Sequence, residues 1–193
     1  MMACAALERD AELMLRVREG DESSFAILLN KHRGPVIHFL YRMIQNQPVA
    51  EELAQEVFLR VYRARESYEP TAKFTTWLFR IANHLALNWI RDGKHERSQT
   101  RIDGDSGEGT SFQLPDRRPT TEEAMLREAR LAEVRRAIQG LPGKQRSAVL
   151  MHKYREMEYT QIAQVLECSE SAVKSLLFRA YETLRGRLAH MAG

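Results

Sequence analysis

Residues 68–91 read YEPTAKFTTWLFRIANHLALNWIR, and this stretch decides how the N-terminal half of the chain folds. A turn signal at Glu69-Pro70-Thr71 opens it, and the hydroxyl of Thr75 or Thr76 is expected to cap a following helix. Apolar residues then recur at helical spacing, as expected of a face turned toward a core: Leu78, Ile81, Ala82, Leu85 and Trp89. The stretch therefore predicts a long amphipathic helix behind a short loop.

The opposite face of this predicted helix is polar and partly cationic. It carries Arg80, Asn83, His84, Asn88 and Arg91. The loop in front holds Tyr68 and Phe74, with Lys73 between them, while Trp77 is expected in the core. Cations, amides that read base edges and aromatic rings that stack on unpaired bases are what single-stranded DNA recognition requires. An ordinary amphipathic helix with core aromatics would show the same pattern, so both interpretations stay open on the residues alone.

The spacing Y-x-P-x-x-x-F-x-T-W-L-x-R-I-A-x-x-x-A-x-x-x-x-R in residues 68–91 resembles the promoter-melting segment of extracytoplasmic-function (ECF) sigma factors. These are small two-domain initiation subunits of bacterial RNA polymerase. The resemblance implies that the polar face and the loop bind the melted minus-ten promoter element. One position departs, since the family commonly has Asn where His84 stands. Asn83 lies one residue earlier, about 100° around the helix, so either residue is a candidate for that role.

An acidic cluster opens another predicted helix, from Val49 to about Ala64. Glu51, Glu52, Gln55 and Glu56 occupy its first two turns, where carboxylates favour a helix N-terminus for purely electrostatic reasons. The run A-E-E-L-x-Q-E-x-F is also similar to the segment by which sigma factors grip the largest subunit of polymerase. The resemblance implies core-polymerase binding by Glu52, Gln55 and Glu56, although the family usually has Asp at position 52.

The remaining N-terminal segments also show helical periodicity. Asp10 is expected to cap a helix over 11–19, and Asp21 or Ser23 a second helix, which Gly34-Pro35 should break or bend. After Arg91 the composition changes, because 92–119 is rich in Gly and Pro. We therefore expect a flexible linker. The predicted organisation is one domain over 1–97, the linker over 98–120 and a second domain over 121–193.

The second predicted domain contains a helix-turn-helix pattern in residues 160–180, TQIAQVLECSESAVKSLLFRA. Thr120 or Thr121 is expected to cap the domain's first helix, which ends at Gly140-Leu141-Pro142. Within the motif, inward residues are expected at Ile162, Leu166 and Val173, with Leu176 or Leu177. Glu167 stands where a glycine often permits a left-handed turn, and Ser169 or Glu170 is expected to cap the second helix.

Polar and aromatic residues lie outward on that second helix, at positions suited to DNA contact. They are Ser171, Lys174, Ser175, Phe178 and Arg179. A helical hairpin with solvated charges would look similar. The flank G-L-P-x-x-Q-R and the run A-V-K-S-L-L-x-R-A, however, resemble the ECF sigma domain that reads the minus-thirty-five element. Leu176 and Tyr181 replace common arginines there, which implies a different element or weaker binding.

The composition agrees with a protein that binds nucleic acid and argues against a metal-binding, secreted or membrane-spanning protein. The chain has 193 residues, 44% hydrophobic and 28% charged, with a net charge of +3, which is a normal globular balance. From Arg127 onward there are twelve Lys and Arg against seven Asp and Glu, which suggests a polyanionic partner for the C-terminal half.

The two cysteines lack metal-ligand spacing, and the sequence shows neither a signal-peptide pattern nor a membrane-spanning run. We expect a cytoplasmic protein without membrane insertion, cofactor, metal or catalytic site of its own.

Together these patterns predict an all-α protein of two small helical domains joined by a flexible linker. The resemblance implies a sigma factor that directs core RNA polymerase to promoters and is controlled by an anti-sigma protein. Its DNA partner would be promoter DNA, as duplex and as melted single strand. A stand-alone helix-turn-helix regulator and a sigma mimic that binds an anti-sigma protein remain the alternatives.

Overall fold

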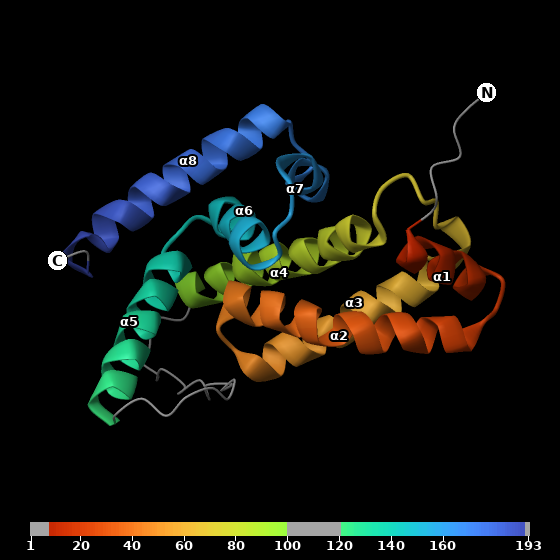
Figure 1. Ribbon diagram of the computed structural model, residues 1–193, viewed down its shortest axis with the longest axis horizontal. Coiled ribbons are helices and arrows are strands. Elements are labelled where there is room, and N and C mark those ends of the chain that lie inside the picture. The colour runs from red at the N-terminus through yellow and green to blue at the C-terminus, as the bar shows by residue number, and fades with distance from the viewer. Residues whose placement is uncertain (1–7, 100–120, 192–193) are drawn as a thin grey trace.

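The computed structural model describes residues 8–99 and 121–191 of the chain, and every regular element in those ranges is a helix, which confirms the predicted all-α class (Figure 1). In chain order the elements are α1 (Arg9–Arg18), α2 (Glu22–Ile44), α3 (Gln47–Arg63), the 3-10 turn η1 (Arg65–Ser67), α4 (Phe74–Gln99), α5 (Thr121–Gln139), α6 (Gly143–Tyr154), α7 (Tyr159–Leu166), α8 (Glu170–Arg187) and the 3-10 turn η2 (Ala189–Met191).

Helices α1 to α4 form the N-terminal bundle. Its core is built from apolar side chains at helical spacing, such as Leu28, Leu40 and Met43 from α2 and Val57 from α3, all fully buried. Aromatic rings complete it, since Phe39 of α2 meets Phe79 of α4 edge to face at 5.4 Å between centroids. Of the core positions predicted on α4, Leu78, Ala82 and Leu85 are buried, and Ile81 and Trp89 are half-buried.

Side chains cap the starts of α2 and α3, and the first of these caps was predicted. The carboxylate of Asp21 accepts hydrogen bonds from the backbone amides of Ser23 and Ser24, so Asp21 caps α2 as expected. The side chain of Asn46 accepts from the amide of Val49 and caps α3, which therefore begins two residues earlier than predicted.

Two other predicted caps are wrong. The helix α1 begins at Arg9, ahead of Asp10, and Asp10 turns inward to pair with α2. The helix α4 begins at Phe74, so Thr75 and Thr76 lie inside its first turn and do not precede it. The cap there comes from a distant residue, because the amide of Phe74 donates to the carboxylate of Glu8 at 3.1 Å.

A break or a bend was predicted at Gly34-Pro35, and the break is wrong, because α2 runs without interruption from Glu22 to Ile44. Proline removes one helical hydrogen bond and normally kinks a helix. Here His32 and Val36, on either side of the proline, are both buried in the same core. Tertiary packing on both sides therefore holds the two parts of α2 in one helix.

The helix α4 likewise continues past the predicted start of the glycine-rich segment. It passes through Gly93 and ends at Gln99, although a glycine inside a helix costs roughly 1 kcal/mol relative to alanine. Packing of Leu87 and Ile90 against the core offsets that cost. Most of the predicted linker, residues 100–120, lies outside the described residues, as does Thr120, so the domain boundaries stay predictions.

Helices α5 to α8 form the C-terminal bundle, and α7 and α8 make the predicted helix-turn-helix. Glu167 ends α7 in the left-handed conformation with φ 53°, and the hydroxyl of Ser169 caps α8 by accepting from the amide of Ala172. Val173 and Leu177 are buried while Leu176 is half-buried, so Leu177 is the inward residue of the pair. The motif is confirmed in its turn, its cap and its inward face.

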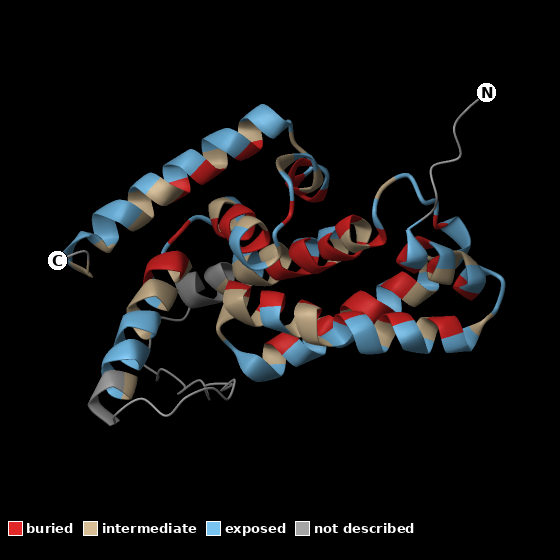
Figure 2. Ribbon diagram, viewed as in Figure 1, coloured by how far each residue is buried: buried red, intermediate tan, exposed pale blue. Residues whose placement is uncertain are grey.

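The two bundles pack against one another, and α4 is the helix they share. Figure 1 shows α6 and α7 lying along α4, and α6 also packs against α2. Both bundles contribute to one continuous group of buried apolar residues, and burial runs along α4 in Figure 2. Both sides of α4 are therefore used in packing.

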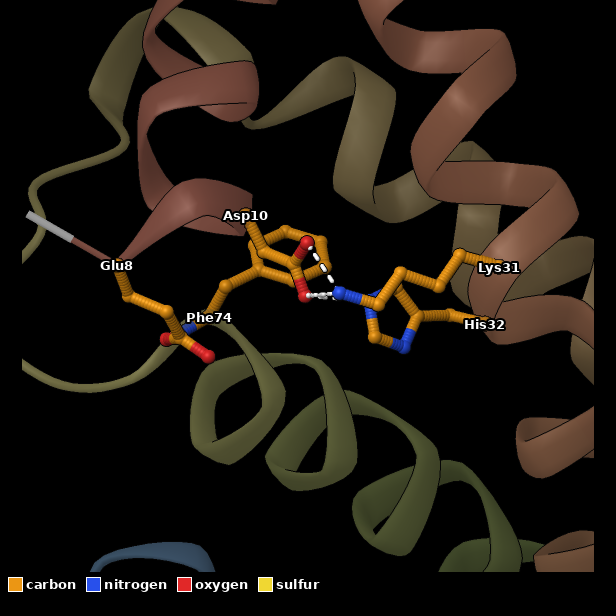
Figure 3. A network of polar contacts seen from close by, with 5 residues as sticks. All are labelled: Glu8, Asp10, Lys31, His32 and Phe74. Atoms are coloured by element: carbon orange, nitrogen blue, oxygen red, sulfur yellow. Dashed lines mark hydrogen bonds and ion pairs between the residues drawn. The ribbon is translucent and has the colours of Figure 1, made fainter.

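A buried polar network ties α1 to α2 and to the start of α4 (Figure 3). One carboxylate oxygen of Asp10 lies 2.9 Å from Nε2 of His32, and Nζ of Lys31 donates to both oxygens at 2.6 and 2.7 Å. Asp10 and His32 are each more than nine-tenths buried. The His32 ring also packs on Phe74, with 5.4 Å between centroids, so the network fixes the point where α4 begins.

Removing the buried carboxylate tests how much this network stabilises the fold. We expect Asp10→Ala to lower the free energy of unfolding by about 2–4 kcal/mol, because a buried imidazole and an ammonium group lose their shared acceptor. Asp21→Ala is the matched control, since it deletes a carboxylate that caps a helix at the surface and should cost much less. Urea unfolding measures both, and equal losses in the two variants would contradict the account.

The same network predicts a loss of stability on acidification. Burial is the main cause that lowers the pKa of His32 below its ordinary value, against the opposing bond from Asp10. A histidine with a lowered pKa in the folded state binds protons more readily when unfolded, so stability falls as the pH drops below about 6.5. We expect His32→Asn to flatten the decline between about pH 6.5 and 5. An unchanged slope in urea unfolding across that range would show that His32 is not its source.

Candidate nucleic-acid interface

Three aromatic rings close the loop in front of α4. The ring of Trp77 lies 4.9 Å from that of Tyr68 and 6.0 Å from that of Phe74, measured between centroids. Tyr68 is 3% exposed and Phe74 is fully buried. Burial, with the charges of Glu8 and Asp10 adding to it, raises the pKa of the Tyr68 hydroxyl to about 12. This hydroxyl has no hydrogen-bond partner in the part of the chain that the structure describes.

Contacts with α1 and with Glu8, which directly precedes it, hold the loop in place. Besides the bond between Glu8 and the amide of Phe74, a guanidinium nitrogen of Arg18 lies 3.5 Å from the carbonyl oxygen of Tyr68. In this conformation neither Tyr68 nor Phe74 presents a ring surface to a base, although both were predicted to contact the minus-ten element. Of the predicted loop residues, Lys73 alone is exposed.

The polar residues predicted on one face of α4 differ strongly in how far they are buried. Arg80, His84 and Arg91 are exposed and Asn88 is half-exposed. Asn83 is 4% exposed, and its amide oxygen has no partner among the described residues. The one-residue step between Asn83 and His84 therefore places them on different sides of the helix, and His84 is the one that faces outward.

Arg80 already has a partner. Its Nε donates to the carboxylate of Glu167 at 2.8 Å, and a second guanidinium nitrogen bonds the same oxygen. Glu167 belongs to the turn of the helix-turn-helix, so this pair joins the two predicted DNA-binding elements. A groove between α4 and α7 surrounds the pair and is lined also by Thr160, Gln164 and Glu170.

The second predicted DNA-binding face lies on α8 and is fully open. All five predicted residues, Ser171, Lys174, Ser175, Phe178 and Arg179, are exposed. Phe178 is 67% exposed, which is unusual for so large an apolar side chain. Together with Lys174, Ser175 and Arg179 it lines a shallow depression. Figure 2 shows exposed residues recurring along α8 between the buried ones.

Packing on the opposite side holds α8 in place. Val173, Leu177 and Ala180 are buried at helical spacing. Near the end of α8, Arg187 donates to the carbonyl oxygens of Ala137 and Gly140, at 2.9 and 3.2 Å. The outward side chains are therefore presented by a helix that is anchored along its length.

The predicted polymerase contacts lie on α3. Glu52 and Gln55 are exposed, and Glu56 is half-exposed with its carboxylate bonded to Nε of Arg60 at 2.7 Å. An exposed apolar residue, Leu59, follows on the same helix. The geometry presents acidic and apolar groups together on a surface that packing inside the bundle does not use.

Several residues with roles in this arrangement were not singled out from the sequence. Glu8 caps α4 from outside any local motif, and no sequence signal marks a contact across 66 positions. Arg146 stands in the G-L-P-x-x-Q-R flank, yet its burial and bonds to the other bundle followed from no local pattern. Within residues 8–99 and 121–191 no helix is long and apolar enough to cross a membrane, and no group of three or more ligating side chains suits a metal ion.

Comparison with known families assigns both bundles. Residues 28–96 match sigma-70 region 2, and residues 131–184 match sigma-70 region 4. The first range contains α3, the loop and the described polar face of α4. The second contains the helix-turn-helix.

Similar proteins extend the match to nearly the whole chain. The RNA polymerase sigma-H factor of Pseudomonas aeruginosa is 32% identical over 180 residues, 92% of each chain. The ECF RNA polymerase sigma-E factor of Escherichia coli is 30% identical, covering 93% of this chain and 94% of that one. The ECF RNA polymerase sigma factor SigW of Bacillus subtilis is 29% identical, covering 90% and 93%.

Solved structures share the fold. CnrH, in complex with the cytosolic domain of CnrY, aligns over 95% of this chain and 99% of that one, with a TM-score of 0.68 and 21% identity. The sigma factor RpoE of Bartonella quintana, in complex with the anti-sigma factor NepR, covers 86% and 96%, with a TM-score of 0.66 and 19% identity. With both sigma regions matched in order and relatives aligned over more than nine-tenths of their length, the chain belongs to the ECF group of sigma-70 RNA polymerase sigma factors.

Proposed function

We propose that this sigma factor divides promoter recognition between two exposed helix faces, α8 for the upstream element and α4 for the downstream one. It acts in the cytoplasm as a specificity subunit, and core RNA polymerase supplies all of the catalysis. The observation that carries the proposal is the exposure of one cationic face on each bundle, within the two matched sigma regions. A stand-alone helix-turn-helix regulator would leave the region 2 match unexplained.

The α8 face suits duplex DNA. Lys174 and Arg179 supply cations for phosphate oxygens or for guanine edges, and Ser171 and Ser175 supply hydroxyls. The exposed ring of Phe178 adds an apolar surface that can contact a thymine methyl group. Because Leu176 and Tyr181 are both half-buried, the two departures from the family pattern lie at the margin of this face and reduce its cationic character.

The α4 face suits an unpaired strand. Lys73, Arg80 and Arg91 supply positive charge for the phosphates of the DNA strand. His84 and Asn88 supply groups that can hydrogen-bond base edges. Stacking of a base on an aromatic ring contributes about 1–3 kcal/mol, comparable to the cost of unstacking it. Tyr68 and Phe74 take part in such stacking only after the loop opens, and Asn83 only after α4 rotates, so the exposed residues make the first contacts.

The α3 surface is assigned to core polymerase through Glu52, Gln55 and Glu56. These side chains lie outside both DNA-facing surfaces, so one sigma chain can hold polymerase and promoter at the same time. Control by an anti-sigma protein is part of the proposal, and a solved structure of the same fold, RpoE of Bartonella quintana, is a complex with an anti-sigma factor.

Run-off transcription tests the function as a whole. We expect core polymerase with this chain to make start-site-specific transcripts from a subset of genomic promoter fragments. Glu52→Lys/Gln55→Ala should abolish them, because charge reversal on α3 opposes binding to the polymerase. Glu12→Lys, the same reversal on an exposed residue of α1, is the control and should leave transcription intact. Salt-dependent duplex binding by the chain alone, with no transcript, would contradict the sigma function.

The α8 assignment makes a separate prediction for holoenzyme. Lys174→Ala and Arg179→Ala should each weaken promoter binding about fivefold or more, and each should lower the salt dependence by about one phosphate contact. Arg185→Ala deletes an exposed arginine farther along α8 and should have little effect. Fluorescence anisotropy measures the affinities. Equal losses on DNA with a scrambled upstream element would assign the two side chains to phosphate contacts, and unchanged affinity for the intact promoter would contradict the α8 assignment.

A further inference from the structure

A small cavity lies where α2 and α6 pack against one another. Its volume is about 120 Å³. Phe39 of α2 and Leu150 of α6 form apolar walls, and the polar lining consists of His38, Arg42, Tyr154 and Arg155. None of the lining residues that the structure describes is acidic. The cavity therefore brings cations together without a carboxylate.

The two arginines of this lining are stacked on aromatic rings. The guanidinium carbon of Arg42 lies 4.1 Å from the ring centroid of Tyr154, and that of Arg155 lies 4.7 Å from the ring centroid of Phe79. Stacking uses the face of a guanidinium and leaves its in-plane N–H groups available to other partners. Within the part of the chain that the structure describes, neither guanidinium donates a hydrogen bond or joins an ion pair, and Nε of Arg155 is buried without a partner.

The charge of Arg155 is half-buried and has no opposite charge beside it. Burial lowers the pKa of its guanidinium, and no carboxylate among the described residues counteracts that effect. Arg42, also half-buried, brings a second positive charge to the same cavity. Two like charges in a poorly solvated space raise each other's free energy, and an anion between them relieves that repulsion. The charges of the cavity therefore favour an anionic ligand.

Both arginines stand at the C-terminal end of a helix, where backbone carbonyl oxygens carry partial negative charge. These oxygens are already hydrogen-bonded. The oxygen of Arg42 accepts from Gln139 at 2.5 Å, and the oxygen of Met43 accepts from Arg146 at 2.6 Å. In the last turn of α6, the oxygen of Met151 accepts from two backbone amides. The helix ends therefore oppose an anion less than free carbonyls would, and the guanidinium charges dominate.

The size of the cavity restricts the ligand to a small anion or to one end of a larger molecule. One water takes up about 30 Å³ in the liquid, so a volume of about 120 Å³ holds about four waters or a single tetrahedral oxyanion. Arginine binds phosphate through two parallel N–H bonds, which gives such a site geometric specificity. A phosphate inside a DNA strand does not suit the cavity, because the strand would have to enter and leave beside it.

We propose that this cavity is a binding site for a phosphate group, held between Arg42 and Arg155. The group belongs either to inorganic phosphate or to the end of a small phosphorylated metabolite. The site is additional to the function assigned above, which uses α3, α4 and α8. Its ligand contacts α2 and α6 at once, so binding is linked to the packing of these two helices.

Isothermal titration calorimetry on the free, full-length chain at constant ionic strength tests the proposal. We expect inorganic phosphate to bind at one site per chain with a dissociation constant below about 1 mM. AMP and GDP, titrated in the same way, distinguish the two sources of the phosphate group. Tighter binding of either nucleotide than of inorganic phosphate would identify a nucleotide as the source, and weaker binding of both would identify free phosphate.

Substitutions of the two arginines locate the site. We expect Arg42→Gln/Arg155→Gln to weaken phosphate binding at least about tenfold, because both cations are lost. Arg42→Lys keeps the charge and should still weaken binding about threefold or more, because lysine cannot form the paired bonds. Arg33→Gln removes an exposed arginine of α2 outside the lining, and this matched control should bind as wild type does. Circular dichroism checks that each variant is folded.

Three results would overturn the proposal. The first is the absence of phosphate binding to the wild-type chain up to about 10 mM, a result that depends on no variant. The second is an equal loss of affinity in Arg33→Gln and in the double variant, which would show a general attraction of anions to the cationic surface. The third is complete displacement of bound phosphate by a short DNA duplex, which would assign the arginines to the DNA backbone.

Discussion

The arrangement of the molecule depends on the packing of α4 from two sides. One side supplies Leu78, Ala82 and Leu85 to the N-terminal core, and the other meets α6 and α7. A helix packed in this way has only a narrow strip left for a ligand. The strip holds Arg80, His84, Asn88 and Arg91, and its direction is set by the buried residues on either side.

Contacts with the N-terminal segment fix the position at which α4 begins. Glu8 supplies the cap, and the buried pair of Asp10 and His32 holds α1 where that cap can reach Phe74. A buried pair of this kind contributes less to net stability than its short distances suggest, because both groups give up hydration. Its effect is positional: it fixes where the loop before α4 lies and keeps Tyr68 and Phe74 packed against Trp77.

Much of this architecture was predictable from the sequence because the signals were local. Helical periodicity identified the helices, Asp21 and Ser169 acted as caps, and the position of Glu167 in a turn indicated a left-handed residue. The errors came where distant packing overrides local preference. Pro35 stays inside α2 because residues on both sides of it are buried, and Asp10 pairs across helices where a local cap was expected.

The residues of the candidate site also fall into two groups, those whose exposure was predictable from the sequence and those whose burial was not. Its exposed members, such as Lys174 and Arg179 on α8, follow from helical phase alone. The burial of Tyr68, Phe74 and Asn83 does not, because burial depends on which neighbouring segments cover a residue. The step from Asn83 to His84 shows this best: the sequence identified the ambiguity, and the structure places His84 outward and Asn83 inward. The contact between Arg80 and Glu167 joins positions 87 residues apart and had no local signal.

The central claim is that the exposed strip of α4 captures the melted strand, and permanganate reactivity of promoter thymines in the holoenzyme complex tests it most directly. We predict reactive thymines within the minus-ten element for wild type and for Asn83→Ala. We predict that His84→Ala/Asn88→Ala loses this reactivity while the complex still protects the upstream element from nuclease. Full reactivity in His84→Ala/Asn88→Ala would contradict the claim, as would its loss in Asn83→Ala alone.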